Sequence, residues 1–262
     1  MNKYKGFTLY SDVDNTLLTK SWGIPQRNID ALNRFTEEGG RFALATGRGP
    51  TQRTFDLLEK LPMVNIPCIF LNGGMLFDSR TRERIAFHTL PDSLRGTITE
   101  ICREYPEWPV TICTRDDRFQ VGPDVEPQVL CRDIQDVALP WGKILFHVSA
   151  ETRTQAMQWL EARELSGADV TASDETLVEI VPHGVSKGAA LEDVIARYSL
   201  DRSKVAAIGD YYNDMDMLTV PGIRTFCPAN AAPEIKKVCR TTVCSVQDGA
   251  LADVIEILGK DA

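Results

Sequence analysis

The 262-residue chain lacks the patterns that mark several large classes of protein. No apolar run approaches the roughly 20 residues that a membrane-spanning helix needs, and no Gly-x-Gly-x-x-Gly motif follows the first predicted strand. The three histidines do not have the spacing of zinc ligands, and the seven cysteines include no Cys-x-x-Cys pair. A membrane-spanning protein, a dinucleotide-dependent oxidoreductase and a zinc protein are therefore disfavoured.

An excess of positive charge and a leader segment are also missing. With 29 basic and 37 acidic residues the formal net charge is -8, which argues against binding to nucleic acid or to a membrane surface. A phosphorylated ligand stays possible, because a single site can be locally positive. The first residues contain no apolar segment of the signal-peptide kind, and the cysteines are odd in number and scattered. A reducing cytoplasm is the expected location.

Short apolar runs and helical patterns follow one another along the first third of the chain. Residues 7–10, 42–45 and 68–71 have the length and composition of buried strands, and residues 26–38 repeat apolar side chains at helical spacing. Within the runs, apolar and polar residues do not alternate, which is typical of strands covered on both faces. This order predicts the α/β class, with a Rossmann-like, doubly wound parallel sheet.

The pattern changes at about residue 83 and returns at about residue 182. Between these points the apolar runs 110–113 and 118–121 flank a short turn, which predicts an antiparallel hairpin. Afterwards the strand–helix rhythm of the first third resumes. We therefore expect a core of residues 1–82 and 182–262, with residues 83–181 inserted as an α+β domain.

Two carboxylates, Asp12 and Asp14, directly follow the first predicted strand. Side chains two residues apart on an extended chain point the same way, and open α/β sheets bind ligands at the carboxyl ends of their strands. Such a pair suggests a carboxylate nucleophile, a second carboxyl group that exchanges a proton, and a divalent metal that relieves the repulsion. The alternative is a plain turn, since Asp, Asn and Thr are common where strands end.

Two further segments offer groups that could bind a phosphate. Thr46 and Gly47 lie between the second strand and the next helix, where a hydroxyl and an unobstructed backbone amide form a natural phosphate cradle. Lys187 lies in the first turn of a helix predicted to begin after Ser186, where a cation is unfavourable unless an anion is near. Taken singly, a strand–helix turn and a surface lysine are the simpler interpretations.

Acidic residues also follow the strand predicted at 205–208. Asp210 ends that strand and Asp214 comes four residues later, so both can join Asp12 in an oxygen-rich pocket suited to Mg²⁺. Asn213 adds a neutral donor without adding repulsion. Capping of the next helix by Asn213 or Asp214 is the structural alternative. Jointly, acids, a hydroxyl–amide cradle and a lysine at the strand ends of one sheet are what phosphoryl transfer requires.

With these residues the chain resembles the phosphatases of the haloacid dehalogenase superfamily, in particular the Cof-like subfamily with a type IIB cap. The four matching motifs are the run from Asp12 to Thr16, Thr46, Lys187, and the run from Gly209 to Asp214. The resemblance covers essentially the whole chain, including the insert between the second and third motifs. Asn15 stands where the family usually has glycine. Because Asn tolerates a left-handed backbone, the turn is expected to persist.

The resemblance implies a role for each motif. Asp12 would be the nucleophile that forms an aspartyl-phosphate, and Asp14 would protonate the leaving alcohol and then deprotonate the attacking water. The groups implied to hold Mg²⁺ are the Asp12 carboxylate, the Asp14 carbonyl, Asp210, and Asp214 directly or through water. The groups implied to bind the phosphoryl oxygens are Thr46, Gly47, Lys187 and Asn213.

The sequence thus predicts a Mg²⁺-dependent phosphatase of a small phosphorylated metabolite, with sugar phosphates as the leading class and residues 83–181 as a specificity cap. Arg48 and Asn72 are possible contacts to substrate or cap, and Trp22 is expected to be buried in packing. Two alternatives stay open. One is a sugar phosphomutase, which has a similar architecture, and the other is a protein that binds a phosphorylated ligand without turning it over. The sequence selects neither a particular substrate nor an oligomeric state.

Overall fold

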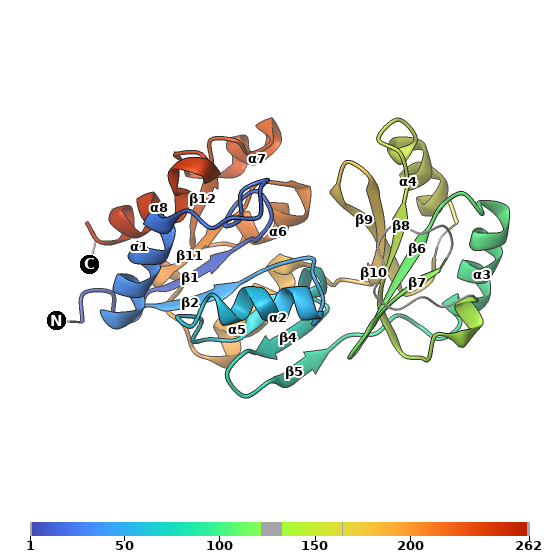
Figure 1. Cartoon of the computed structure of the whole chain (residues 1–262), viewed down its shortest axis with the longest axis horizontal. Helices are drawn as coiled ribbons and strands as arrows, with labels where there is room; N and C mark the ends of the chain where they lie inside the picture. The colour runs from blue at the N-terminus through green and yellow to red at the C-terminus, as the bar shows by residue number, and fades with distance from the viewer. Residues whose placement is uncertain (1, 122–132, 164, 261–262) are drawn as a thin grey trace. The chain divides into compact units, whose positions relative to one another are not determined.

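The chain forms two compact units in the computed structural model (Figure 1), which describes residues 2–121, 133–163 and 165–260. The first unit consists of Met1–Gly47, Asp56–Ile85 and Ser186–Ala262, and the second of Arg48–Phe55 and Ala86–Val185. Three separate segments of the chain therefore build the first unit. The short stretch Arg48–Phe55 groups with the second unit, which no sequence pattern indicates.

A five-stranded parallel sheet lies at the centre of the first unit, in the order β13-β12-β11-β1-β2. The strands are β1 (Thr8–Ser11), β2 (Arg41–Leu44), β11 (Val205–Ile208), β12 (Arg224–Pro228) and β13 (Thr241–Val243). In the central strand β1, Ser11 is in register with Leu44 on one side and with Ile208 on the other. Every residue of β1 and β11 is buried, which confirms the predicted parallel sheet covered on both faces.

Helices flank this sheet. The helices of the first unit are α1 (Gln26–Glu37), α5 (Lys187–Arg197), α6 (Met215–Leu218), α7 (Pro233–Val238) and α8 (Ala250–Leu258), while α2 (Gln52–Glu59) crosses the boundary between the units. Figure 1 shows α1 and α8 side by side next to the sheet, and α5 packs against α6. The predicted N-cap of α5 is confirmed, because Ser186 Oγ accepts a hydrogen bond of 3.1 Å from the backbone N–H of Ala189.

The third predicted strand, at residues 68–71, was expected in the parallel sheet but pairs mainly in a separate antiparallel sheet. β3 (Cys68–Phe70) pairs antiparallel with β4 (Met75–Asp78), and β5 (Glu83–Phe87) completes a three-stranded sheet. An isolated parallel bridge between Ala45 and Ile69 links β3 to the end of β2. The prediction of a strand at residues 68–71 is confirmed. Its place as a full strand of the parallel sheet is wrong, because the chain turns back directly after β3 and pairs with itself.

An antiparallel sheet with helices on one face makes up the second unit, in the strand order β7-β6-β8-β10-β9. Its elements are α3 (Leu94–Glu104), β6 (Val110–Thr114), β7 (Arg118–Val121), β8 (Trp141–His147), α4 (Arg153–Glu161), β9 (Ala168–Asp174) and β10 (Leu177–Pro182). Ile98 of α3, Leu160 of α4 and Ile144 of β8 share one hydrophobic core. The predicted α+β character and the β6–β7 hairpin are confirmed. Among the described residues, no helix is both long enough and apolar enough to cross a membrane.

A buried ion pair lies on the other face of this antiparallel sheet. Lys143 Nζ of β8 is 2.7 Å from Glu179 Oε1 of β10, and each side chain is 1% exposed. Ser173 of β9 donates a hydrogen bond to the same carboxylate oxygen. Because successive residues of a strand face opposite sides, Lys143 points away from the core that its neighbour Ile144 joins. The pair and the serine thus link three adjacent strands.

Candidate active site

The strand register brings three of the predicted motifs to one edge of the parallel sheet. The backbone N–H of Asp12 donates to the carbonyl of Ile208 at 2.9 Å, and the N–H of Ala45 donates to the carbonyl of Ser11 at 2.8 Å. Asp12 therefore lies level with Gly209 and Ala45 on its two neighbours, and the residues one step further are Asp210 and Thr46. The predicted convergence of these residues at the carboxyl ends of the strands follows directly from the pairing.

Lys187 connects two of the carboxylates. Its Nζ lies 2.6 Å from Asp12 Oδ1 and 2.7 Å from Asp214 Oδ1, and the lysine side chain is 0% exposed. The simpler interpretation of Lys187 as a surface lysine is thus wrong. Burial alone would lower the pKa of this ammonium group, but the charges of Asp12 and Asp214, and the hydrogen bonds to them, raise it above its usual value. The two carboxylates thus favour the charged form of Lys187.

A close approach of two loops fixes the start of α5, and with it Lys187. Gly73 has a φ of 104°, and a Cβ atom at this position would lie 2.2 Å from the carbonyl oxygen of Ser186. No other residue fits without moving the backbone of one of the two segments. The turn after β3 therefore supports the first turn of α5 through direct backbone contact.

Asp12, Asp210 and Asp214 form a buried cluster in which one carboxylate oxygen from each lies within 4.8 Å of the others. Burial raises the pKa of Asp12 well above its usual range; Lys187 opposes this shift and the neighbouring acidic groups add to it. Burial, followed by the charge of Asp214, raises the pKa of Asp210 to about 7. Lys187 pairs with Asp12 and Asp214, and Asp210 adds a third carboxylate to the cluster, so the cluster gains from a further cation. Oxygen donors of this kind suit a hard divalent ion such as Mg²⁺.

Within this cluster, Asp214 differs from the other two acids. While Oδ1 of Asp214 binds Lys187, its Oδ2 accepts hydrogen bonds from the backbone N–H groups of Asp210 at 3.0 Å and Tyr211 at 3.2 Å. A Cβ atom at Gly209 would lie 2.4 Å from Asp214 Cγ, so the strand end must be glycine for this carboxylate to fold back over it. With both oxygens engaged, Asp214 fits a water-mediated role at a metal better than a direct one.

The loop after Asp12 has the left-handed turn that the sequence allows. Asn15 has a φ of 58°, so the prediction that asparagine preserves the turn of the motif is confirmed. The Thr16 hydroxyl donates to Asp210 Oδ1 at 2.9 Å, and Asn230 Nδ2 donates to the Asn15 carbonyl at 2.8 Å. The charge of Asp14 adds to the raised pKa values of Asp12 and Asp210, after the larger effects of burial and of the other charges. The sequence gives no specific signal for Asn230.

Thr46 and Asn213 are connected through Asn72. The Thr46 side chain is 1% exposed, and its carbonyl accepts the backbone N–H of Asn72 at 3.0 Å. Asn72 has a φ of 55°, and its Oδ1 accepts a hydrogen bond of 3.1 Å from Asn213 Nδ2. Asn72 thus belongs to the first unit with the predicted phosphate-binding groups. Gly47 is the last residue of that segment of the first unit, and Arg48 groups with the second, so the predicted contact of Arg48 stays a prediction.

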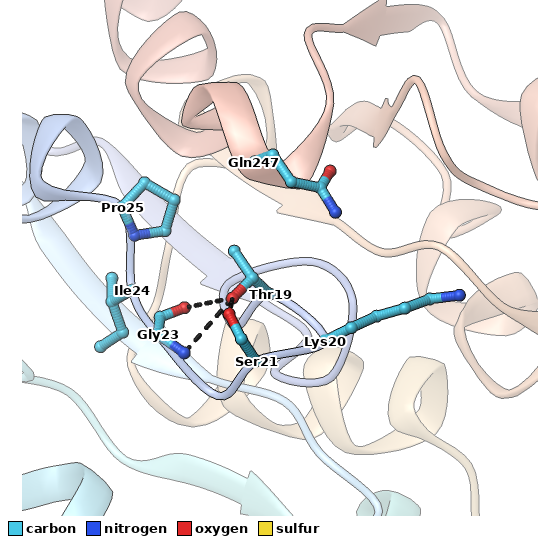
Figure 2. A pocket seen from close by; sticks show the side chains of 7 residues that line it. All are labelled: Thr19, Lys20, Ser21, Gly23, Ile24, Pro25 and Gln247. Atoms are coloured by element: carbon cyan, nitrogen blue, oxygen red, sulfur yellow. Dashed lines mark hydrogen bonds between the residues drawn. The ribbon is translucent and has the colours of Figure 1, made fainter.

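An open hollow of about 430 Å³ lies beside the segment that follows the first motif (Figure 2). Its lining consists of Thr19, Lys20, Ser21, Gly23, Ile24, Pro25 and Gln247, with no predicted catalytic residue among them. Thr19 Oγ1 is 2.9 Å from Ser21 Oγ and 3.3 Å from the backbone nitrogen of Gly23, so the loop is held by its own hydrogen bonds. Trp22 is 53% exposed, so the expectation of a buried Trp22 is wrong.

Comparison with known proteins adds independent information. A family model described as haloacid dehalogenase-like hydrolase matches residues 9–255. Among relatives, the 5-amino-6-(5-phospho-D-ribitylamino)uracil phosphatase YwtE of Bacillus subtilis is 24% identical over 292 residues, which cover 94% of this chain and 96% of that one. The match of the family model therefore extends through both units.

Solved structures agree over a similar length. A haloacid dehalogenase-like hydrolase from Bacteroides thetaiotaomicron aligns with a TM-score of 0.84 at 24% identity, covering 97% of this chain and all 100% of that one. The subclass IIB sugar phosphatase BT4131 aligns with a TM-score of 0.84 at 15% identity, covering 97% and 99% of the two chains. At these identities the structural matches establish the fold.

Proposed function

The chain belongs to the haloacid dehalogenase-like hydrolase family and is a phosphoric monoester hydrolase, and we propose that it hydrolyses sugar or polyol phosphates with Mg²⁺ through an aspartyl-phosphate. The observation that carries this proposal is the buried contact of Lys187 with Asp12 and Asp214 at the carboxyl edge of the sheet. Phosphoryl transfer needs a nucleophile and preorganised positive groups around the phosphoryl oxygens. The names of two similar proteins, a sugar phosphatase and a phosphoribitylamino-uracil phosphatase, support the substrate class.

Asp12 is the proposed nucleophile. Its Oδ1 accepts the hydrogen bond from Lys187, so Oδ2 is the candidate attacking atom. Attack on phosphorus forms the bond from Asp12 to the phosphoryl group and breaks the bond to the sugar oxygen. The Lys187 ammonium orients the Asp12 carboxylate and favours its ionised form against the effect of burial, which matters because a neutral carboxyl group would be a poor nucleophile.

Asp14 is the proposed acid and base. It gives a proton to the departing sugar oxygen, and it then takes a proton from the water that attacks the aspartyl-phosphate. The second step releases inorganic phosphate and restores Asp12.

The remaining motif residues are proposed to hold the phosphoryl oxygens. These are the Thr46 hydroxyl, the Gly47 N–H, the Lys187 ammonium and the Asn213 amide. Mg²⁺, when bound, would neutralise the excess of carboxylates and polarise the phosphoryl group. The proposed ligands are the Asp12 carboxylate, the Asp14 carbonyl, Asp210, and Asp214 through water; the fit rests on the buried oxygen cluster of Asp12, Asp210 and Asp214.

Residues 83–181 are proposed to act as the cap that selects the leaving group, with Arg48 and Asn72 as possible substrate contacts. A cytoplasmic location is part of the same proposal. In this proposal the inserted domain sets the substrate, while the groups beside Asp12 perform the chemistry.

A hydrolysis screen tests the proposal. The purified protein is incubated with a panel of phosphorylated metabolites and Mg²⁺, and released phosphate is measured with and without EDTA. We expect phosphate release from sugar or polyol phosphates that EDTA stops and added Mg²⁺ restores. Conversion of a hexose 1-phosphate to its 6-isomer without free phosphate would support the phosphomutase alternative instead, and binding without turnover across the panel would support a non-catalytic ligand-binding protein.

A further inference from the structure

The turn Leu71–Gly73, between β3 and β4, contacts segments of three predicted motifs. The backbone N–H of Asn72 donates to the carbonyl of Thr46 at 3.0 Å, and the N–H of Thr46 donates to the carbonyl of Ile69 at 2.8 Å. Both backbone groups of Thr46 are therefore held by the end of β3 and by this turn. The side-chain oxygen of Asn72 accepts a hydrogen bond of 3.1 Å from Asn213 Nδ2, so the turn reaches the fourth motif as well.

Gly73 makes the contact with the third motif. Ser186 is the first residue of the first unit after the chain leaves the second, and its side chain caps α5. A Cβ atom at Gly73 would lie 2.2 Å from the Ser186 carbonyl oxygen and 3.3 Å from the backbone nitrogen of Lys187. Any residue larger than glycine would therefore move the turn or the backbone at the start of α5.

The backbone of the turn is left-handed at three successive residues. The φ angles are 54° at Leu71, 55° at Asn72 and 104° at Gly73. Leucine rarely adopts a positive φ, so this conformation costs free energy at Leu71, whose side chain is 0% exposed. Strained backbone persists only where the surrounding structure determines it, and it is common at functional sites. The contacts with the three motifs and the burial of Leu71 are what hold this turn.

We propose that the turn Leu71–Gly73 is a positioning element for the phosphate-binding groups. Asn72 acts through Asn213, because an amide nitrogen has two N–H donors and can give one to Asn72 while the other is directed at a phosphoryl oxygen. Gly73 acts through Lys187, because it fixes where α5 begins and hence where the ammonium group lies. This assignment rests on the proposed function, and it differs from a direct contact of Asn72 with the substrate.

A double-mutant cycle tests whether Asn72 acts through Asn213. The variants are Asn72→Gly, which keeps the left-handed backbone without strain, Asn213→Ala, and the two combined. The measurements are KM for the best panel substrate and the dissociation constant of inorganic phosphate. We expect each single variant to raise both values by about fivefold, and the double variant to raise them no further than Asn213→Ala alone. Effects that multiply in the double variant would overturn the proposal and support a direct contact of Asn72 with the substrate.

A pair of glycine variants tests the contact with α5. Gly73→Ala places a methyl group against Ser186 and should lower kcat by about tenfold or more. Gly39→Ala is the matched control, since Gly39 also has a positive φ, of 93°, but precedes β2 at the opposite edge of the parallel sheet. A Cβ atom there would lie 3.4 Å from Lys5 Cα, an ordinary contact, so turnover should stay near that of wild type. Wild-type kcat in a folded Gly73→Ala variant would overturn the role of Gly73.

Hydrogen exchange provides a readout that does not need turnover. Amides of residues 186–190 should exchange faster in Gly73→Ala than in wild type or Gly39→Ala, and equal rates in the two variants would overturn the support of α5 by the turn. If wild type releases no phosphate from any panel compound, the proposed function fails, whereas the exchange rates and the phosphate dissociation constants still decide the positioning role. If Gly73→Ala does not fold, the cycle at Asn72 and Asn213 decides it.

Discussion

Lys187 Nζ lies 2.6 Å from Asp12 Oδ1, although 175 residues separate them in sequence. The lysine is wholly buried and also binds Asp214. A cation in the first turn of a helix opposes the helix dipole, so its position is explained by the carboxylates that it meets. These contacts join the end of β1, the loop after β11 and the start of α5 in one charged cluster.

Lys187→Met is expected to reduce kcat by about 100-fold or more, because it removes the charge proposed to stabilise the transferring phosphoryl group. Lys60→Met, at an exposed position, is the matched control and should leave turnover unchanged. Steady-state kinetics on the best panel substrate provides the measurement. Near-normal turnover in Lys187→Met would remove Lys187 from the mechanism.

Asn72 offers a test that separates backbone from side chain. Asn72→Gly and Asn72→Ala both remove the hydrogen bond to Asn213. Each should therefore raise KM by about fivefold, with a smaller effect on kcat. Asn72 has a φ of 55°, which glycine adopts without strain and alanine does not. Asn72→Ala should therefore be less stable than Asn72→Gly by about 1 kcal/mol in urea unfolding. Equal stabilities, or unchanged KM values, would contradict this account.

The acidic cluster should make the stability of the metal-free protein fall as the pH rises, and should make the stabilisation by Mg²⁺ grow as the pH rises. The pKa of Asp210 is raised to about 7 in the folded protein, so the folded state binds this proton more tightly than the unfolded state. Metal-free protein should lose stability as the pH rises from about 4 to about 7, because deprotonation then costs folding free energy. Mg²⁺ binds the deprotonated form, so its stabilising effect should be larger at about pH 8 than at about pH 5.

Thermal unfolding with EDTA or with Mg²⁺ across this pH range measures both effects. Asp210→Asn is the control, since it removes the titrating group and should flatten the pH dependence. An increase in Tm with Mg²⁺ that is the same at both pH values would argue against metal binding by this cluster.

We expect the buried Lys143–Glu179 ion pair to contribute to the stability of the second unit. Lys143→Met removes the ammonium group 2.7 Å from the buried Glu179 carboxylate, and should lower the free energy of unfolding of this unit by about 3–5 kcal/mol. The exposed pair of Arg163 and Glu104, with Nη2 and Oε2 2.6 Å apart, gives the control. Arg163→Met should cost about 1 kcal/mol or less, because surface ion pairs contribute little. Urea unfolding followed by circular dichroism compares the two, and similar losses would show that burial of the pair is unimportant.

Residues at strand ends could be predicted from the sequence because parallel strands share a register. Asp12, Thr46 and Asp210 follow short, continuous apolar runs, so their meeting at one edge follows from the sheet alone. The left-handed conformation of Asn15 could also be predicted, since asparagine is one of the few residues other than glycine that adopt it. The helical stripe and the serine cap also predicted the start of α5 correctly.

Other features depend on contacts that no local pattern encodes. A lysine at a helix start is ordinarily a surface residue, and the burial of Lys187 against Asp12 and Asp214 depends on contacts between segments distant in sequence. Asn230 binds the Asn15 turn from a loop without a motif. The reversal of the chain after β3 places this strand in an antiparallel sheet. Trp22 is exposed, although its large aromatic side chain suggested that it would be buried in packing.

The identity of the nucleophile is the most direct test of the central claim. Wild type and Asp12→Asn are mixed with substrate and Mg²⁺, quenched during turnover, treated with borohydride, and analysed by peptide mass spectrometry. The account predicts reduction of an acyl phosphate at residue 12 in wild type, no such product in Asp12→Asn, and loss of turnover in a variant that still folds. Undiminished hydrolysis by Asp12→Asn, or an acyl phosphate trapped at another residue, would contradict it.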